Sequence, residues 1–251
     1  MTTVIKRRAD APAGFFEAEA AGLAWLASAG MPTAPVIRVE PGLIGLERIV
    51  EVTPTAREAQ LFGQRLARMH AAGAASFGAP PDGWDGPLFI GDRRMPVADE
   101  ATWGRFYARD RVLPFLEAAR RAGTVTTAEA RDVTSACDRI GAGEFDDGDG
   151  PARIHGDLWS GNVLWSKDGV RLIDPAAHGG HRETDLAMLA LFGCPHLSQI
   201  QEGYQSVTPL RAGWRRRVPL HQLHPLAVHA AGHGRSYGLA LHEAALAVLD
   251  L

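Results

Sequence analysis

Hydrophobic positions in the first fifty residues follow two different periods. Residues 3–8 can form a short strand, whereas residues 13–29 have apolar side chains at helical spacing, with Gly30 and Pro32 ending the helix. The residues expected on one face of this helix are Phe16, Ala20, Leu23, Ala24 and Ala27. Residues 35–39 and 43–49 resemble two strands joined by a Pro-Gly turn. The segment is therefore predicted to run strand, helix, strand, strand.

After Thr55 the pattern becomes mostly helical. Helices are expected over 56–72, 101–121 and 127–140, the second kinked at Pro114, and the first with Phe62, Leu66 and Met69 on one face. Residues 73–100 are rich in Gly and Pro and predict a long loop. Short strands are expected over 152–155, 162–165 and 170–173, the last two forming a hairpin. Residues 183–250 are expected to be helical in at least three pieces, with breaks at Pro195, Pro209 and Pro219.

Composition limits the class of protein. A chain of 251 residues with 46% hydrophobic residues suits one large domain or two small lobes. The net charge of −3 gives no reason to expect nucleic acid or a membrane surface as partner. Two cysteines form neither a disulfide framework nor a zinc site, and no bilayer-spanning run or signal peptide is evident. We therefore expect a soluble, cytoplasmic protein. The sequence does not set its oligomeric state.

The strongest chemical signal is His155-Gly156-Asp157-Leu158-Trp159-Ser160-Gly161-Asn162, which has the form H-x-D-x-x-x-x-N of a kinase catalytic loop. Asp174 follows Asn162 by twelve residues, at the end of the predicted hairpin. Asp157 can accept a hydroxyl proton, and Asn162 with Asp174 can offer oxygen ligands to Mg²⁺. A structural loop with capping Asp and Asn is the alternative, but the hairpin and Asp174 at this spacing favour phosphoryl transfer.

Three further features extend this prediction. Trp159 either stacks on a sugar face or packs in the protein. The segment 178–188 carries two histidines and two acids at a spacing that suits no standard zinc pattern, and Asp185 is expected to brace the catalytic loop from behind. Lys6, one of only two lysines, is expected to pair with Glu17 or Glu19 of the following helix and to position nucleotide phosphates. Helical geometry does not choose between the two acids, and a surface role for Lys6 is the alternative.

Several stretches resemble the fructosamine kinase (ketosamine kinase) family, which is related to the aminoglycoside phosphotransferases. They are HGDLWSGNV at 155–163, IDPAAHGGHRETDLAM at 173–188 and LFG at 191–193. Weaker matches are FEAEAAGL at 16–23, FIG at 89–91, WGRFYARDRVLPFL at 103–116 and residues 220–237. The resemblance covers nearly the whole chain.

The resemblance implies an α+β, protein-kinase-like two-lobed fold, with a small β-rich N-lobe over residues 1–50 and a larger helical C-lobe over 51–251. It implies ATP and Mg²⁺ as cofactors and selects Glu19 as the partner of Lys6. It makes Leu46 the gatekeeper position, so that Glu47 and Ile49 would offer backbone groups to adenine. Among the catalytic-loop residues, Trp159 and His155 are expected to contact substrate.

The implied reaction is phosphorylation of the sugar hydroxyl at carbon 3 of a fructosamine or ribulosamine, carried by a small molecule or a glycated protein. The phosphorylated adduct then falls apart, which repairs or salvages glycated amines. The alternatives are a kinase of another small hydroxylated substrate, such as an aminoglycoside or choline-like compound, and a catalytically impaired kinase-like protein.

Two departures from the family bear on these expectations. Family members have two strands and a Gly-rich loop before the lysine strand, and residues 1–14 contain no replacement for them. Either the true start lies upstream, or this is a short form with weak or absent ATP binding. In addition, Gly86-Pro87-Leu88 replaces a usual Asp-Asn pair before Phe89, which puts nearby substrate contacts in doubt.

Overall fold

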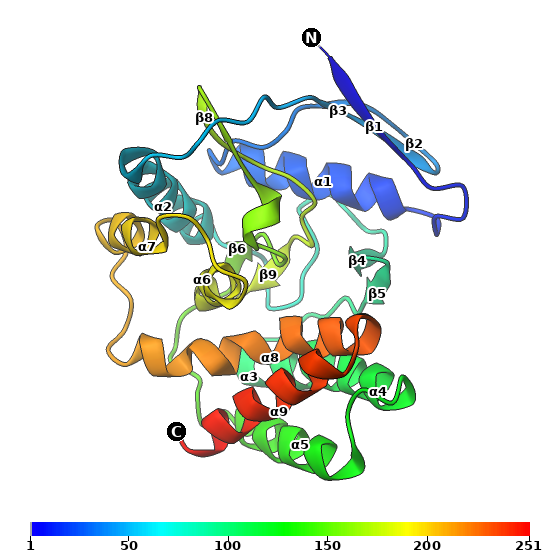
Figure 1. Cartoon of the computed structure of the whole chain (residues 1–251), viewed down its shortest axis with the longest axis vertical. Coiled ribbons are helices and arrows are strands. Elements are labelled where there is room, and N and C mark those ends of the chain that lie inside the picture. Colours follow the sequence, from blue (N-terminus) through cyan, green and yellow to red (C-terminus); the bar gives the residue numbers. More distant parts are fainter. Residues whose placement is uncertain (1) are drawn as a thin grey trace.

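The computed structural model describes residues 2–251, and its N-terminal part is a small antiparallel sheet covered by one helix. Strands β1 (Thr3–Arg7), β3 (Leu43–Glu47) and β2 (Val36–Glu40) lie side by side in that order, and α1 (Phe15–Ser28) packs against them (Figure 1). The side chains buried between sheet and helix are Phe16, Leu23, Ala34, Ile44 and Leu46. The predicted order of strand, helix, strand, strand is confirmed.

The predicted apolar face of α1 is partly wrong. Ala24 and Ala27 are exposed, whereas Trp25 and Leu26 are buried. Apolar residues surround this helix on most sides, so helical periodicity alone does not single out one face. The two faces that are buried contact the sheet and the helical part of the molecule, which places α1 between them.

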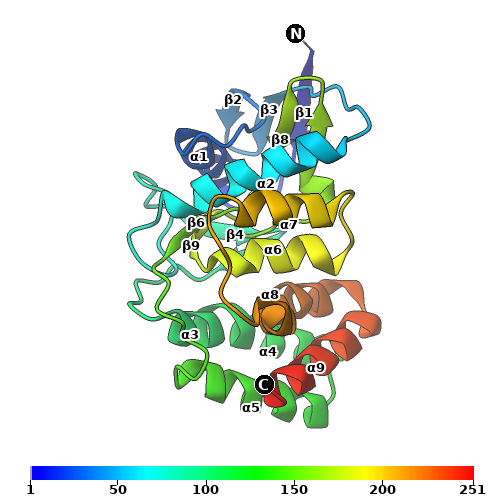
Figure 2. The same cartoon turned by 90° about the vertical axis from the view of Figure 1, so that its left-hand side faces the viewer.

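Helices α2 (Ala56–Ala71) and α7 (Leu197–Gln205) lie side by side in the middle layer of the molecule (Figure 2). A capping box fixes the start of α2, and Phe62, Leu66 and Met69 are buried as predicted. Gly63 and Gly203 lie at the contact between these helices, where a Cβ on either would overlap a carbonyl of the facing helix. The two glycines therefore allow the backbones to approach closely.

The lower part of the molecule is a helical assembly around a second, larger core. Its elements are α3 (Trp103–Phe106), a π-helical turn (Tyr107–Val112), α4 (Leu113–Arg121), α5 (Thr127–Gly141), α8 (Trp214–His233) and α9 (Arg235–Leu249). The helix expected over 101–121 forms as a continuous helical run over 103–121, and its irregularity is the π-helical turn just before Pro114. The break expected at Pro219 is wrong, because packing on α4, α6 and α9 holds α8 together across it.

Short strand pairs connect these layers. The hairpin of β7 (Val163–Ser166) and β8 (Gly169–Leu172) forms as predicted, and Leu172 accepts a hydrogen bond from the Ala34 N–H at 3.0 Å. Two pairings were not expected from sequence. One is the hairpin of β4 (Leu88–Ile90) and β5 (Arg93–Met95) inside the predicted loop; the other joins β6 (Ala152–Ile154) to β9 (His178–Gly180), just before α6 (Arg182–Leu191). Among the helices of residues 2–251, none is long and apolar enough to cross a bilayer.

Candidate active site

A cavity of about 440 Å³ opens between α1, the β4–β5 turn and the loop after β6. Its size is within the range of small-molecule sites. The residues that line it are Lys6, Phe15, Phe16, Ala18, Glu19, Phe89, Gly91, Asp92, Asp157, Trp159, Asn162, Asp174, Pro175 and Ala176. Segments more than 150 residues apart in the chain thus supply one site, and the sequence-predicted Asp157, Asn162 and Asp174 are all in it.

Lys6 is the cation of this cavity. Strand pairing with β3 places it opposite Ile44, and its ammonium contacts the carboxylates of both Glu19, at 2.7 Å, and Asp174. Burial opposes its charge, but the two carboxylates raise the pKa of Lys6 above the ordinary value. The structure thus selects Glu19 over Glu17 as its helix partner and joins the lysine to the hairpin that carries Asp174.

The catalytic loop holds Asp157 at the base of the cavity. Asn162 donates from Nδ2 to the backbone carbonyl of Asp157 at 2.8 Å and to its carboxylate at 3.3 Å. Burial raises the pKa of Asp157 to about 6, and the nearby charge of Asp174 adds to this effect. A carboxylate with such a pKa is ionised at neutral pH and can accept a proton in general-base catalysis.

Asp185, at the start of α6, holds the catalytic loop from behind. It is fully buried, and its carboxylate accepts the backbone N–H groups of His155, at 2.8 Å, and Gly156, at 3.0 Å. His70 of α2 contributes a third contact at 3.1 Å. Burial alone would raise the pKa of Asp185, but these hydrogen bonds lower it below the ordinary value. This is the position expected for a residue that supports the loop.

The two residues expected to contact substrate differ in position. His155 is fully buried and its Nε2 lies 2.9 Å from the carbonyl oxygen of Ile173, so the structure places it between the loop and the hairpin and not in the cavity. Trp159 lines the cavity and is 40% exposed. Its indole covers Gly161 and lies edge-on to Phe192, with ring centroids 6.3 Å apart. Trp159 therefore packs with part of its ring and offers the rest to a ligand.

Asn162 and Asp174 lie at the two ends of the β7–β8 hairpin and both line the cavity. The Ile173 N–H donates to the backbone carbonyl of Asn162 at 3.2 Å, which keeps the start and end of the β7–β8 hairpin together. Asp174 has a left-handed backbone with φ of 51°, a conformation often kept at functional sites. Its carboxylate side chain is 43% exposed. Since Asn162 Nδ2 already donates to Asp157, the amide oxygen remains available as an acceptor.

The charges of the cavity fit a divalent cation. Glu19, Asp157 and Asp174 supply three carboxylates, and Lys6 is the cation among the lining residues. Burial raises the pKa of Glu19 to about 7 despite the opposing effect of Lys6. A raised pKa leaves Glu19 partly protonated at neutral pH, so the oxygen ligands that Mg²⁺ prefers come mainly from Asp157, Asp174 and the Asn162 amide.

Glu47 and Ile49, predicted to face adenine, lie outside the residues that line this cavity. The Glu47 N–H donates to the Pro35 carbonyl at 2.9 Å, and Ile49 packs against the core between the sheet and α1. Glu47 is the last residue of β3, and Ile49 follows it in the segment that leads to α2. Their adenine contacts stay a prediction.

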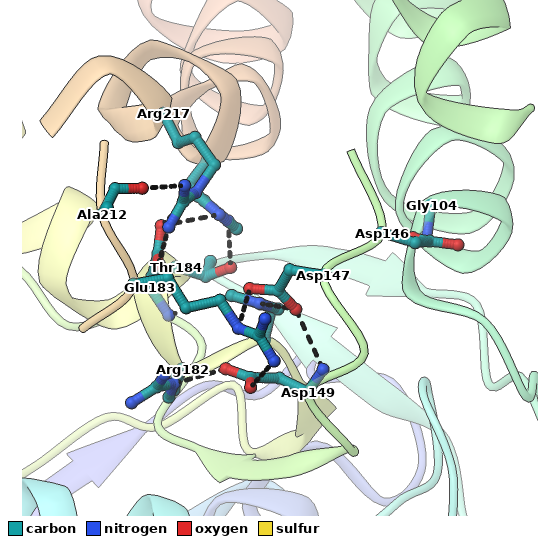
Figure 3. A network of polar contacts seen from close by, with 12 residues as sticks. Gly104, Asp146, Asp147, Asp149, Arg182, Glu183, Thr184, Ala212 and Arg217 are labelled. Atoms are coloured by element: carbon teal, nitrogen blue, oxygen red, sulfur yellow. Dashed lines mark hydrogen bonds and ion pairs between the residues drawn. The ribbon is translucent and has the colours of Figure 1, made fainter. Parts of the chain in front are cut away.

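The polar segment at the start of α6 is an ion-pair network (Figure 3). Arg182 contacts Asp149 at 2.6 Å, and Arg217 contacts Glu183 at 2.6 Å. His181 and the acidic side chains of Asp147 and Asp149 bring possible ligand atoms within 4.8 Å of one another, but arginines already pair with the two acids. We therefore interpret these ion pairs as contacts that fix the start of α6, and with it the position of Asp185.

An aromatic wall formed by Phe15 and Phe89 also lines the cavity and was not predicted as part of the site. Phe15 of α1 and Phe89 of β4 meet with ring centroids 5.1 Å apart. At the cavity mouth, Arg8 stacks on Phe15 and contacts Asp92 of the β4–β5 turn at 2.6 Å. The resemblance of residues 89–91 to a known family was the only sequence signal here, because the hairpin is too short for a periodic pattern.

Fold and site together define a phosphotransferase with a hydroxyl group as acceptor, in a protein-kinase-like fold of mixed helix and sheet. An aminoglycoside phosphotransferase structure has the same fold, with a TM-score of 0.61 at 19% identity over 99% of this chain and 86% of that chain.

The chain belongs to the fructosamine kinase family, whose model matches residues 3–250. It is 32% identical over 247 residues to the probable ketoamine kinase of Thermus thermophilus, covering 96% of this chain and 85% of that protein. A crystal structure of a candidate fructosamine-3-kinase from Thermobifida fusca is 45% identical, with a TM-score of 0.92 over 99% of this chain and 86% of that chain. Membership of this kinase family implies ATP as the phosphoryl donor.

Proposed function

We propose that the protein transfers the γ-phosphoryl group of ATP, with Mg²⁺, to the hydroxyl at carbon 3 of a ketoamine sugar and thereby contributes to the removal of glycation from amines. The observation that carries this proposal is the convergence of Lys6, Asp157, Asn162 and Asp174 on one cavity. Membership of the ketoamine kinase family supports the substrate class.

Each side chain then has a defined task. Asp157 accepts the proton of the attacking sugar hydroxyl, for which its pKa of about 6 is suited. Lys6, held by Glu19, binds phosphate oxygens of the nucleotide. Asn162 and Asp174 hold Mg²⁺, which when bound neutralises charge on the phosphates.

The substrate side of the cavity is aromatic. Trp159 offers a flat apolar surface to the sugar, and Phe15 and Phe89 form the aromatic wall. Sugars present apolar C–H faces that pack on such rings, while their hydroxyls reach polar groups at the cavity base. An aromatic wall with a single base suits a small sugar adduct, carried by an amine that points toward solvent.

The test is a transfer assay with ATP, Mg²⁺ and either ribulosyl-lysine or fructosyl-lysine, with ³¹P NMR to locate the phosphate. Kanamycin and choline serve as competing acceptor classes. Asp157→Asn is the matched control because it keeps the side-chain shape and removes the base. Transfer to carbon 3 of a ketoamine supports the proposal; transfer only to kanamycin or choline, or no difference from the Asn variant, overturns it.

A further inference from the structure

A buried cation beside the active site has no part in the chemistry described so far. Arg111 lies in the π-helical turn between α3 and α4, is 1% exposed, and its guanidinium stacks on Phe106 at 4.5 Å. Burial lowers the pKa of Arg111 to about 9. The neighbouring carboxylate of Asp110 instead pairs with Arg109 at 2.8 Å. Among residues 2–251, no carboxylate forms an ion pair with Arg111.

Besides donating from Nη1 to the carbonyl of the neighbouring Asp110 at 3.0 Å, the Arg111 side chain forms hydrogen bonds to two other segments. Its Nε donates to Nε2 of His178 at 3.3 Å, and its Nη1 donates to the carbonyl of Pro96 at 2.8 Å. The turn itself is held by His224 of α8, whose Nδ1 lies 2.9 Å from the Arg111 carbonyl. A π-helical turn carries an extra residue relative to an α-helical turn and often occurs at a functional site.

The first segment, residues 174–178, begins with Asp174, the proposed metal ligand, and ends with His178. Nδ1 of His178 lies 2.7 Å from the carbonyl oxygen of Ala176. Because that nitrogen must donate, Nε2 is the acceptor and fits the Arg111 donor. Burial and the charge of Arg111 hold the pKa of His178 well below the usual range, which keeps the ring neutral. Asp174, Pro175 and Ala176 line the cavity one after another.

The second segment adjoins the aromatic wall. Pro96 directly follows β5, and the β4–β5 hairpin contributes Phe89, Gly91 and Asp92 to the cavity. The Arg111 guanidinium therefore forms hydrogen bonds to two segments: to His178, which follows the proposed metal ligand Asp174, and to Pro96, which follows the β4–β5 hairpin. These two segments are separated by about eighty residues in the chain.

We propose that Arg111, acting through His178 and the Pro96 carbonyl, is a positioning residue that sets the distance between Asp174 and the β4–β5 wall of the active site. This inference rests on the proposed function, since it assigns Asp174 to Mg²⁺. A buried charge is costly, and an apolar side chain of similar volume usually fills such a space with equal or better stability. Holding the two segments at a fixed distance needs hydrogen-bond donors that point in set directions, which explains why an arginine occupies this buried position.

The test compares Arg111→Met, His178→Phe, the double variant and Arg111→Lys. The matched control is Arg139→Met, since Arg139 also stacks on an aromatic ring and donates to two carbonyls, but at the far end of α5. In Arg111→Met we expect kcat to fall about 10- to 100-fold at equal folded fraction. The Mg²⁺ concentration for half-maximal rate should rise about tenfold.

Two results identify positioning as the cause. The double variant should be no worse than the single variants, since both interrupt one path. Arg111→Lys should recover part of kcat because an ammonium can still reach one carbonyl. If Arg111→Met fails to fold, Arg111→Lys replaces it in the comparison. Normal kcat and Mg²⁺ dependence in folded Arg111→Met, or a loss matched by Arg139→Met, would overturn the inference.

Hydrogen–deuterium exchange separates this inference from the proposed function, because it needs no turnover. Without ligands, Arg111→Met should speed exchange at residues 174–178 and 89–96 and leave α5 unchanged. If the wild-type protein phosphorylates no ketoamine, the proposed function fails, while the exchange data still decide whether Arg111 holds these segments. Unchanged exchange in both segments contradicts the positioning role whatever the substrate.

Discussion

Replacing the proposed base should stabilise the folded protein while it removes activity. Asp157 is half-buried beside Asp174, and its pKa is raised from 3.8 to about 6. A carboxyl group whose pKa is raised on folding binds its proton more tightly in the native state. Ionising it therefore costs stability, and that cost is fully present above the folded pKa and absent below the unfolded pKa.

The magnitude follows from the pKa shift. At about 1.4 kcal/mol per pKa unit, the shift sets a ceiling of about 3 kcal/mol on the cost at pH 7.5. Water at the cavity mouth screens part of it, so about 1–2 kcal/mol is a realistic gain for Asp157→Asn. For a chain of this size that gain raises Tm by about 2–8 °C. The Asn162 contact survives, since an amide oxygen can still accept it.

The assay is thermal unfolding at pH 7.5 and pH 4 in EDTA, because a bound cation would offset the carboxylate charge. Asp168→Asn, in the exposed β7–β8 turn, is the control for loss of one negative charge. We expect Asp157→Asn to raise Tm at pH 7.5, the gain to shrink toward pH 4, and phosphoryl transfer to be lost. An unchanged or lowered Tm at pH 7.5, or an equal gain at pH 4, would refute the electrostatic reasoning.

Three further outcomes are expected. Gly63→Ala and Gly203→Ala should each lower the free energy of unfolding in urea by about 1–3 kcal/mol, although Ala is the better helix former, because a Cβ overlaps the facing helix. Lys6→Met should lower kcat/KM for ATP about 10- to 100-fold by removing the donor to phosphate, while Lys167→Met, in an exposed turn, should not change it. Asp185→Asn should cost about 1–3 kcal/mol in urea unfolding, since an amide cannot accept both backbone N–H groups of the catalytic loop.

The sequence predicted best where local signals agree. Phe62 and Leu66 repeat at helical spacing, and this periodicity predicted α2; in the structure a capping box of Thr55 and Glu58 begins the helix at the same place. The catalytic loop was found from residue types at fixed spacing, because phosphoryl transfer needs a base and oxygen ligands at set distances. The lysine partner was open on geometry, and the contact between Lys6 and Glu19 agrees with the family resemblance.

Other features depend on contacts that no local pattern encodes. The β4–β5 hairpin and β9 have three-residue strands, too short for an alternating pattern to stand out. The π-helical turn before Pro114 has ordinary helical residues, and the partners of its Arg111 side chain lie in other elements, so no local pattern indicates it. The face of α1 was misjudged because apolar residues surround it and burial is decided by two neighbours at once.

Asp157 and Asp185 show why a site must be read from its surroundings. Asp157 lies in the catalytic loop, and Asp185 of α6 contacts that loop. Burial taken alone raises the pKa of both carboxyl groups. Asp185 receives two backbone N–H groups and His70, so its pKa falls below the ordinary value and its charge holds the loop. Asp157 receives an amide contact from Asn162 and faces Asp174, so its pKa rises toward the range where a base exchanges protons. The number of hydrogen-bond donors aimed at each carboxylate therefore separates the supporting residue from the proposed base.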